Sequence, residues 1–324
     1  MKSNKINILI LAPYKFIKLN NILNKNKFNF FFKYKKEKNI SKSFKKKIDG
    51  IIVNPGSNYK INQTFLENYI NLKIIVTPST GVNHIDNLEC DKRKIKVISL
   101  LDNRRVLNSI TASAEFTFSL ILYGLRKMKR ISEMSNIGDW RTNEDFYRGY
   151  ELDKKKIGIV GLGRIGKKIE KYCTAFGAIC SFYDPYVKTH NKRIKKVATL
   201  NKIFSQNNII VLCPYLNNNN YQMINKNLLN QMKKNSILIN TSRGEIINED
   251  DLLIFIKKRK DVLVNLDVIQ NEQVKLKKNK ILNYYKQKGT NLMITPHVAG
   301  LTYESQSKAG LFAINCIIKY FEKK

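Results

Sequence analysis

Short apolar runs alternate with longer polar or amphipathic segments along most of the chain, a pattern typical of alternating strands and helices. In the first part of the chain, strands are expected at 6–11, 28–32, 50–53, 72–76 and 96–100, and helices at 64–70 and 86–94. Apolar residues in 110–130 recur at helical spacing on most faces, which predicts a helix buried between domains or subunits. Residues 131–153 lack this periodicity and are predicted to form a connecting arm.

The alternation resumes after the arm, at 157–160, 178–183, 209–212, 228–232, 237–239, 250–257, 262–266 and 293–294. A last helix is expected at 303–321, and the basic segment 274–288 is expected to be an exposed loop. The pattern therefore predicts an α/β protein with parallel sheets.

The most informative stretch is 157–184, where an apolar run is followed by Gly-Leu-Gly-Arg-Ile-Gly, a helical run and a second apolar run. This is the order of a dinucleotide-binding βαβ unit. Gly161 permits the tight turn, Gly163 lets the backbone approach a pyrophosphate, and Gly166 lets the helix pack against the strand. Asp184, at the end of the second run, is placed to meet the ribose hydroxyls and would repel the extra phosphate of NADP. NAD is therefore the predicted cofactor.

The charge of the chain is strongly positive. Its 324 residues, enough for two domains, include 59 Lys and Arg against 25 Asp and Glu, a formal net charge of +34. Such a charge can indicate a nucleic-acid or membrane surface. We favour a compositional origin, because only 11 of the 59 are arginine, the residue preferred for phosphate recognition. A nucleic-acid partner and a membrane partner are not expected.

The cysteines Cys90, Cys173, Cys180, Cys213 and Cys316 show no paired spacing. Neither a zinc site nor a disulfide framework is predicted, and a cytoplasmic protein is expected. The apolar run at 6–11 has the pattern of a first strand and leaves no room for a cleavable signal. The strongly apolar stretch 116–125 is too short to span a bilayer.

Four further segments follow predicted strands and carry polar or charged side chains. They are Ser-Thr-Gly-Val-Asn-His-Ile-Asp at 79–86, Asn-Thr-Ser-Arg-Gly at 240–244, Leu-Asp-Val-Ile-Gln-Asn-Glu at 266–272 and Thr-Pro-His-Val-Ala-Gly at 295–300. Because ligands bind beyond the carboxyl ends of parallel strands, these segments are candidates to converge on one site.

With these motifs and the glycine turn, the sequence resembles the D-isomer-specific 2-hydroxyacid dehydrogenases from about residue 50 to the C-terminus. The resemblance implies two doubly wound parallel-sheet domains, with a Rossmann cofactor domain inserted into a flavodoxin-like substrate domain. Residues 1–103 and 298–324 would form the substrate domain, and residues 104–297 the NAD-binding domain.

The resemblance also implies a catalytic trio of Arg243, Glu272 and His297. Arg243 would grip the carboxylate of a 2-oxo acid and polarise its ketone. His297 would donate the proton in reduction, and Glu272 would favour the protonated ring and fix its tautomer. The alternatives are a surface arginine, a solvated glutamate and a structural histidine. Of the other histidines, His84 is expected to pack in its loop and His190 to be exposed.

The residues implied to bind the cofactor lie mainly in the glycine turn and in the later loops. They are Gly161, Gly163, Arg164, Ile165, Gly166, Asp184, Cys213, Pro214, Thr241, Ser242, Asp267, Gly300 and Ser113. Arg164 would assist at the pyrophosphate, Ser113 would approach the nicotinamide and Asp267 would contact the carboxamide end. Backbone N–H groups at Thr80 and Gly81 would hold the substrate carboxylate, and no metal is expected.

Some positions depart from the family's pattern. Gln273 stands where a proline commonly follows the glutamate, and Leu212 stands where a histidine is common. Phosphoglycerate dehydrogenases typically place arginines at the positions of Asn54 and Thr77, so a 3-phosphorylated substrate is disfavoured. Formate dehydrogenases carry glutamine at the position of Glu272, which disfavours that branch.

The sequence therefore predicts an NAD-dependent oxidoreductase, with two domains closing over a small 2-oxo acid such as glyoxylate, hydroxypyruvate or pyruvate and interconverting it with its D-2-hydroxy acid. A homodimer is expected to pair through the helix at 110–130 and the arm after it. Two alternatives stay open: a phosphoglycerate dehydrogenase lacking a regulatory domain, and an NAD-sensing binding protein of the corepressor type.

Overall fold

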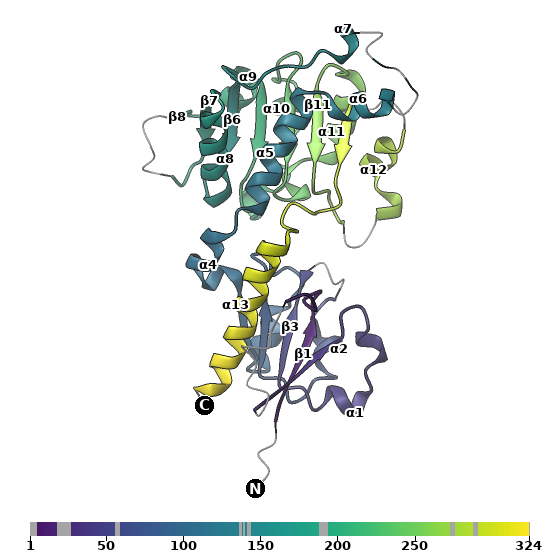
Figure 1. The fold of residues 1–324 in the computed structure, drawn as a ribbon, viewed down its shortest axis with the longest axis vertical. Helices are drawn as coiled ribbons and strands as arrows, with labels where there is room; N and C mark the ends of the chain where they lie inside the picture. Colours follow the sequence, from purple (N-terminus) through teal and green to yellow (C-terminus); the bar gives the residue numbers. More distant parts are fainter. Residues whose placement is uncertain are drawn as a thin grey trace. The chain divides into compact units, whose positions relative to one another are not determined.

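The chain divides into two compact units, residues 1–110 with 302–324, and residues 111–301 (Figure 1). The computed structural model describes residues 5–17, 27–55, 59–135, 138, 140, 144–187, 194–272, 276–287 and 291–323.

The predicted domain boundaries, after 103 and after 297, fall several residues too early. Helix α4 (Arg104–Ser109) packs on the short helix η3 (Leu100–Asp102) and on α13 (Tyr303–Glu322), so it stays with the first unit. At the second boundary, the carboxylate of Asp267 accepts hydrogen bonds from the N–H groups of Val298 and Ala299, which ties 298–301 to the second unit.

The first unit contains a five-stranded parallel sheet. Its strands are β1 (Ile6–Leu11), β2 (Phe28–Phe32), β3 (Gly50–Val53), β4 (Ile74–Thr77) and β5 (Lys96–Ser99), in the order β2-β1-β3-β4-β5. This is the flavodoxin-like order that the resemblance implied.

Both faces of this sheet are buried, since alternate residues of a strand point to opposite faces. On one face, Ile10, Ile52 and Val76 pack in a core with Phe312 and Ile317 of α13. The other face is covered by elements that include α1 (Lys42–Lys45), α2 (Gln63–Leu66) and α3 (Asn87–Lys92). Helix α13 therefore completes a core that residues near the N-terminus begin.

The second unit contains a seven-stranded parallel sheet. Its strands are β6 (Lys156–Val160), β7 (Ile179–Tyr183), β8 (Lys195–Lys196), β9 (Ile209–Leu212), β10 (Ile237–Asn240), β11 (Leu263–Leu266) and β12 (Leu292–Ile294), in the order β12-β11-β10-β9-β6-β7-β8. The strand order reverses between β6 and β9, which is the switch point of a Rossmann fold.

Helices cover both faces of this second sheet. Helices α5 (Ala112–Leu125) and α8 (Arg164–Ala175) lie on one face, while α9 (Leu200–Gln206), α10 (Lys226–Leu229) and α11 (Glu249–Lys258) contribute to the core on the other face. The sheet is therefore apolar on both sides, which explains its continuous apolar strands.

Three predicted segments differ from the structure. The helix expected at 110–130 is two helices, because α5 ends at Leu125, Lys127 adopts a φ of 50°, and α6 (Met128–Ser135) starts anew. The connecting arm contains the end of α6 and the short helix α7 (Glu144–Tyr147). Within the described part of the expected loop at 274–288 lies α12 (Lys280–Tyr285), whose Ile281 and Tyr284 are buried.

One segment, Arg104–Leu125, is long and apolar enough by composition to cross a membrane. The structure breaks it into α4 and α5 at Ile110 and Thr111, and α5 packs against β10 and β11. Within α5, residues such as Leu120, Ile121 and Leu125 are buried in the second unit, so this part of the segment belongs to a protein core.

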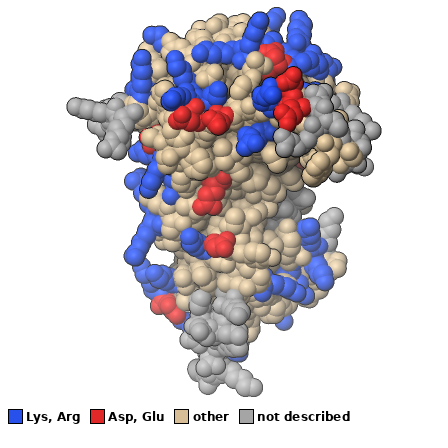
Figure 2. Space-filling view, turned by 45° about the horizontal axis from the view of Figure 1, so that its top comes forward, with Lys and Arg blue, Asp and Glu red and all other residues tan. Residues whose placement is uncertain are grey.

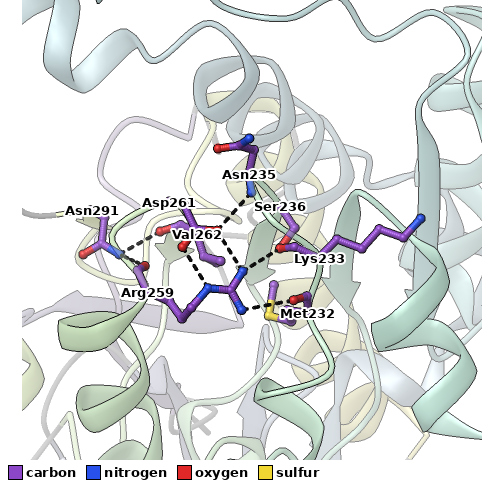
Figure 3. Close-up of polar contacts among 8 residues, drawn as sticks. All are labelled: Met232, Lys233, Asn235, Ser236, Arg259, Asp261, Val262 and Asn291. Carbon is purple, nitrogen blue, oxygen red and sulfur yellow. Dashed lines mark hydrogen bonds and ion pairs between the residues drawn. The ribbon is translucent and has the colours of Figure 1, made fainter.

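A hydrogen-bonded network fixes the amino ends of β10, β11 and β12 (Figure 3). The guanidinium of Arg259 donates two bonds of 2.8 Å to Asp261, and further bonds to the carbonyls of Met232 and Lys233. The amide of Asn291 donates to two carbonyls of the same turn. Hydrogen bonds from Arg259 are the main cause that lowers the pKa of Asp261 to about 2.

Candidate active site

The loops that follow β6, β9, β10, β11 and β12 all leave the second sheet at its carboxyl edge, because these strands are parallel (Figure 1). In a doubly wound sheet this edge is where ligands bind. The predicted cofactor loop and the three predicted catalytic residues therefore belong to one edge of one sheet.

The glycine turn after β6 has the geometry that the sequence predicted. Gly161 has a φ of 89°, and a Cβ there would lie 2.9 Å from the backbone nitrogen of Pro214. A Cβ on Gly166 would lie only 2.3 Å from the carbonyl oxygen of Gly161, whereas a Cβ on Gly163 would meet nothing within 4 Å. Helix α8 begins at Arg164, so its N-terminal N–H groups and the half-buried Arg164 are suited to bind a phosphate group here.

Asp184 lies beside this turn. Its Oδ2 accepts the N–H of Leu162 at 2.8 Å, and its Oδ1 accepts the N–H groups of Tyr186 and Val187. These bonds hold the carboxylate against the glycine turn. A carboxylate has about four lone pairs, so one acceptor site is left for a ribose hydroxyl.

Residues predicted to bind the cofactor also lie close to Ser113, which is predicted to approach the nicotinamide. The hydroxyl of Thr117 on α5 contacts the hydroxyl of Thr241 at 2.7 Å and donates to the carbonyl of Ser113. A Cβ on Gly300 would lie 3.6 Å from Oγ of Ser113. Thr117 was missed by the sequence analysis, although a buried threonine one turn after Ser113 in an apolar helix is a detectable signal.

Cys213 and Pro214 follow β9 and adjoin the glycine turn. Burial raises the pKa of the Cys213 thiol to about 12, so the thiol stays neutral at physiological pH. A neutral thiol is a poor nucleophile, which agrees with a lining role.

Arg243 sits in a loop built by a buried asparagine. The Asn240 side chain donates to the carbonyl of Arg243 at 2.8 Å and accepts from both the N–H and the hydroxyl of Ser242. In the described segments 213–225, 241–248, 267–272 and 295–301, which leave β9 to β12, Arg243 is the sole lysine or arginine. Many Lys and Arg side chains, with some acidic ones among them, lie on the face seen in Figure 2, and basic runs occur at 154–156 and 257–260.

Gly244 brings the Arg243 loop into backbone contact with the loop that carries Glu272. A Cβ on Gly244 would lie 2.0 Å from the carbonyl carbon of Ile269 and 2.4 Å from the nitrogen of Gln270. Only glycine permits this approach, so Gly244 sets how closely the two loops pack.

Glu272 and His297 form the predicted pair. Nδ1 of His297 lies 2.5 Å from Oε1 of Glu272. His297 has a φ of 54°, an uncommon conformation for a residue with a side chain, and its N–H donates to the carbonyl of Asp267. Because Glu272 occupies Nδ1, Nε2 is the nitrogen that can exchange a proton with a substrate.

Asp267 is almost fully buried and holds the His297 loop in place. Its carboxylate accepts from the Thr295 hydroxyl at 2.6 Å and from the N–H groups of Val298 and Ala299 at 2.9 Å. These bonds give Asp267 a structural role, while its contact with a carboxamide stays a prediction.

In the first unit, the segment 79–86 follows β4. The N–H of Gly81 donates to the hydroxyl of Ser79 at 3.1 Å, so a substrate carboxylate would have to compete with that hydroxyl. His84 is buried and lies 3.5 Å from the hydroxyl of Thr77. Burial lowers the pKa of His84 to about 4, so it is a neutral packing residue as predicted.

Two predicted features lie outside the described residues, namely the exposure of His190 and the position of Gln273. Within the described part of the chain, no three His, Cys, Asp or Glu side chains gather in a way that could hold a metal ion. The five cysteines are free thiols.

Comparison with known proteins identifies the architecture. Residues 118–299 match the model of the D-isomer specific 2-hydroxyacid dehydrogenase NAD-binding domain. The chain belongs to this family. The match covers more than half of the chain and includes Arg243, Glu272 and His297.

Individual relatives agree with this result. An erythronate-4-phosphate dehydrogenase of Wigglesworthia glossinidia brevipalpis is 32% identical over 280 residues, which cover 85% of this chain and 64% of the relative. A glyoxylate reductase of Thermofilum pendens is 31% identical over 264 residues, covering 80% of this chain and 75% of the relative. The chain spans between half and two thirds of the length of the first curated relatives it matches.

Among solved structures, an NAD⁺-bound 3-phosphoglycerate dehydrogenase of Entamoeba histolytica is similar, with a TM-score of 0.76 and 25% identity. The similarity covers 98% of this chain and 96% of that one. The structural similarity therefore includes the first unit, where the sequence resemblance to the family is weaker.

Proposed function

We propose that this protein is an NAD-dependent oxidoreductase that interconverts a small 2-oxo acid and its D-2-hydroxy acid, in the manner of a glyoxylate or hydroxypyruvate reductase. The observation that carries the proposal is the His297–Glu272 pair on the same sheet edge as the glycine turn and Arg243. A proton donor, a carboxylate-binding cation and a dinucleotide turn are the three parts that carbonyl reduction needs.

Each group has a role in reduction. Bound NADH supplies the hydride to the carbonyl carbon. The forked guanidinium of Arg243 binds the substrate carboxylate and stabilises charge on the carbonyl oxygen. The protonated ring of His297 gives the proton at Nε2 to that oxygen, while Glu272 holds Nδ1 and stabilises the ring before transfer. Binding of a substrate carboxylate by the backbone N–H groups of Thr80 and Gly81 in the first unit rests on the family resemblance alone and stays a prediction.

The cofactor preference follows from Asp184. Three backbone N–H groups hold its carboxylate at the glycine turn. Rotating the carboxylate away from a ribose phosphate would break these hydrogen bonds. Repulsion of the 2′-phosphate favours NAD over NADP.

A small substrate without a phosphate is favoured by the side chains of the first unit. Thr77 is completely buried and Asn54 is uncharged, so neither supplies the cation that a phosphate requires. The relatives named for erythronate 4-phosphate and 3-phosphoglycerate keep a phosphorylated acid as the second candidate.

We further propose a homodimer in the cytoplasm. Exposed apolar side chains, Met128, Tyr150 and Phe176, border a cavity of about 420 Å³ beside the end of α5, together with the charged residues Arg126, Glu151 and Asp153. Exposed apolar side chains beside charged ones favour a protein partner, and a second copy of the chain would cover them. Light scattering at micromolar concentration tests this, and a monomer would refute it. Five free thiols favour a reducing compartment.

The decisive experiment measures NADH oxidation with three unphosphorylated acids, glyoxylate, hydroxypyruvate and pyruvate. It compares them with two phosphorylated acids, 3-phosphohydroxypyruvate and the 2-oxo acid that corresponds to erythronate 4-phosphate. We expect turnover of a small unphosphorylated acid, and a loss of about a hundred- to ten-thousandfold in His297→Ala with NADH binding retained. Preference for a phosphorylated acid would select the second candidate. Tight NADH binding without turnover of any acid would select the NAD-sensing binding protein.

A further inference from the structure

The loop Asp267–Glu272 carries the carboxylate that holds His297, so whatever anchors this loop also positions the pair. Gly244 packs against one side of it through backbone contacts. A second anchor comes from Glu249, the first residue of α11. Its Oε1 accepts the backbone N–H of Gln270 at 2.6 Å.

The same carboxylate reaches a third element. Oε2 of Glu249 accepts the side-chain amide of Asn279, which precedes α12, at 2.9 Å. The Gln270 side chain adds a bond of 2.5 Å to the carbonyl of Ile247, just before α11. One carboxylate therefore joins α11, the Glu272 loop and the start of α12.

Glu249 occupies a position that costs free energy. It is half-buried, and burial is the main cause that raises its pKa, with the nearby carboxylates Glu245 and Asp250 adding to the effect. The bonds from Gln270 and Asn279 oppose that shift. A carboxylate in the first turn stabilises a helix even when it is exposed to solvent. The stability of α11 therefore does not require the Glu249 carboxylate to be half-buried.

We propose that Glu249 is a positioning residue for the active site, which acts through the backbone of Gln270 to hold Glu272 against His297. This inference rests on the proposed roles of Glu272 and His297. Only Asn271 separates Gln270, whose N–H is anchored, from Glu272, whose carboxylate pairs with the ring. Loss of the anchor should therefore loosen the pair without touching the cofactor turn.

The test compares Glu249→Ala and Glu249→Gln with Asp250→Ala. Asp250 is the matched control, since it also joins α11 to the start of α12, through an exposed ion pair of 2.8 Å with Lys280, but makes no hydrogen bond to the described loop 267–272. Glutamine at 249 keeps an oxygen for the N–H of Gln270, so it should restore most of what alanine loses. The chain has three histidines, so proton NMR can follow the ring signals of each one.

In Glu249→Ala, the NMR signals of the His297 ring should move towards their positions in Glu272→Gln, because the ring loses the carboxylate held beside Nδ1. The kcat for reduction should fall by about ten- to a hundredfold, because a supporting shell positions a catalytic group to within about 0.5 Å. KM for NADH should stay unchanged. The buried ring of His84 reports independently that the first unit is folded, and NADH binding reports the same for the second unit.

Three outcomes decide the matter. Unchanged ring signals of His297 in Glu249→Ala overturn the proposal, and so does an equal change in Asp250→Ala, which would indicate a general charge effect. If Glu249→Ala does not fold, Glu249→Gln with the ring signals of the unmodified protein supports the role of the Gln270 bond, whereas the ring signals of Glu272→Gln contradict it. Since NMR needs no turnover, shifted His297 signals in a protein that reduces no 2-oxo acid would leave the positioning role intact while refuting the proposed activity.

Discussion

Replacement of Gly244 by alanine tests whether the close packing of two loops is needed for catalysis. The new Cβ would lie 2.0 Å from the carbonyl carbon of Ile269, whereas ordinary contacts of this kind begin at 3.4 Å. The three nearest atoms all belong to the backbone of Ile269 and Gln270, so no side-chain rotation can relieve the overlap. The loops must therefore separate by roughly 1 Å or more, and a misplacement of this size costs about a hundredfold in rate.

The assay is steady-state reduction of the best 2-oxo acid with NADH, together with urea unfolding. We expect kcat to fall by about a hundredfold and the free energy of unfolding by about 1–3 kcal/mol, the usual cost of overpacking. NADH affinity should survive, because the glycine turn and Asp184 are not displaced. Gly163→Ala is the stability control, since its Cβ would meet nothing within 4 Å. A Gly244→Ala enzyme with kcat within about twofold of the unmodified protein would refute the reasoning.

Three further predictions concern pH, the cofactor and the His297–Glu272 pair. Burial lowers the pKa of His84 to about 4, below its unfolded value, so folding stability should fall as the pH drops from about 6.5 to about 4. Urea unfolding at about pH 7.5 and about pH 5 measures how much free energy of unfolding each protein loses on acidification. The loss in His84→Gln should be about 2 kcal/mol smaller than in the unmodified protein, and equal losses would contradict this. Asp184→Ala should lower the ratio of kcat/KM with NADH to kcat/KM with NADPH. Equal kcat/KM values with both cofactors in the unmodified protein would contradict the NAD assignment. Glu272→Gln should lower kcat for reduction and leave NADH affinity unchanged, because the ring of His297 loses the carboxylate that holds Nδ1; an unchanged kcat would show that the pair is misassigned.

Parts of the site whose partners lie close together along the chain were predictable from sequence. The turn from Gly161 to Gly166 and its acidic partner Asp184 fall within one βαβ unit, and the structure places Asp184 against that turn. Arg243, Glu272 and His297 were assigned by resemblance rather than by spacing. Their positions after parallel strands then placed them on one edge of the sheet.

Residues that support the site from a distance were not found. Thr117 meets Thr241 across 124 positions, and Glu249 meets Gln270 across 21. Asn240 was seen as part of a motif, but not as the side chain that builds the Arg243 loop. Hydrogen bonds between distant segments leave no periodic trace, so a single sequence does not reveal them.

Apolar periodicity and glycine conformations are local properties, so most strands, the glycine turn and the order of the motifs could be predicted from the sequence, although β8 was not. Folding makes α12 a packed helix instead of a loop, ends α5 at Leu125, and extends the first unit to Ile110. Each of these depends on which surface a segment meets after folding. Burial of Ile281 and Tyr284, for example, exists only once the other elements of their core are in place, and no local pattern can specify that surface.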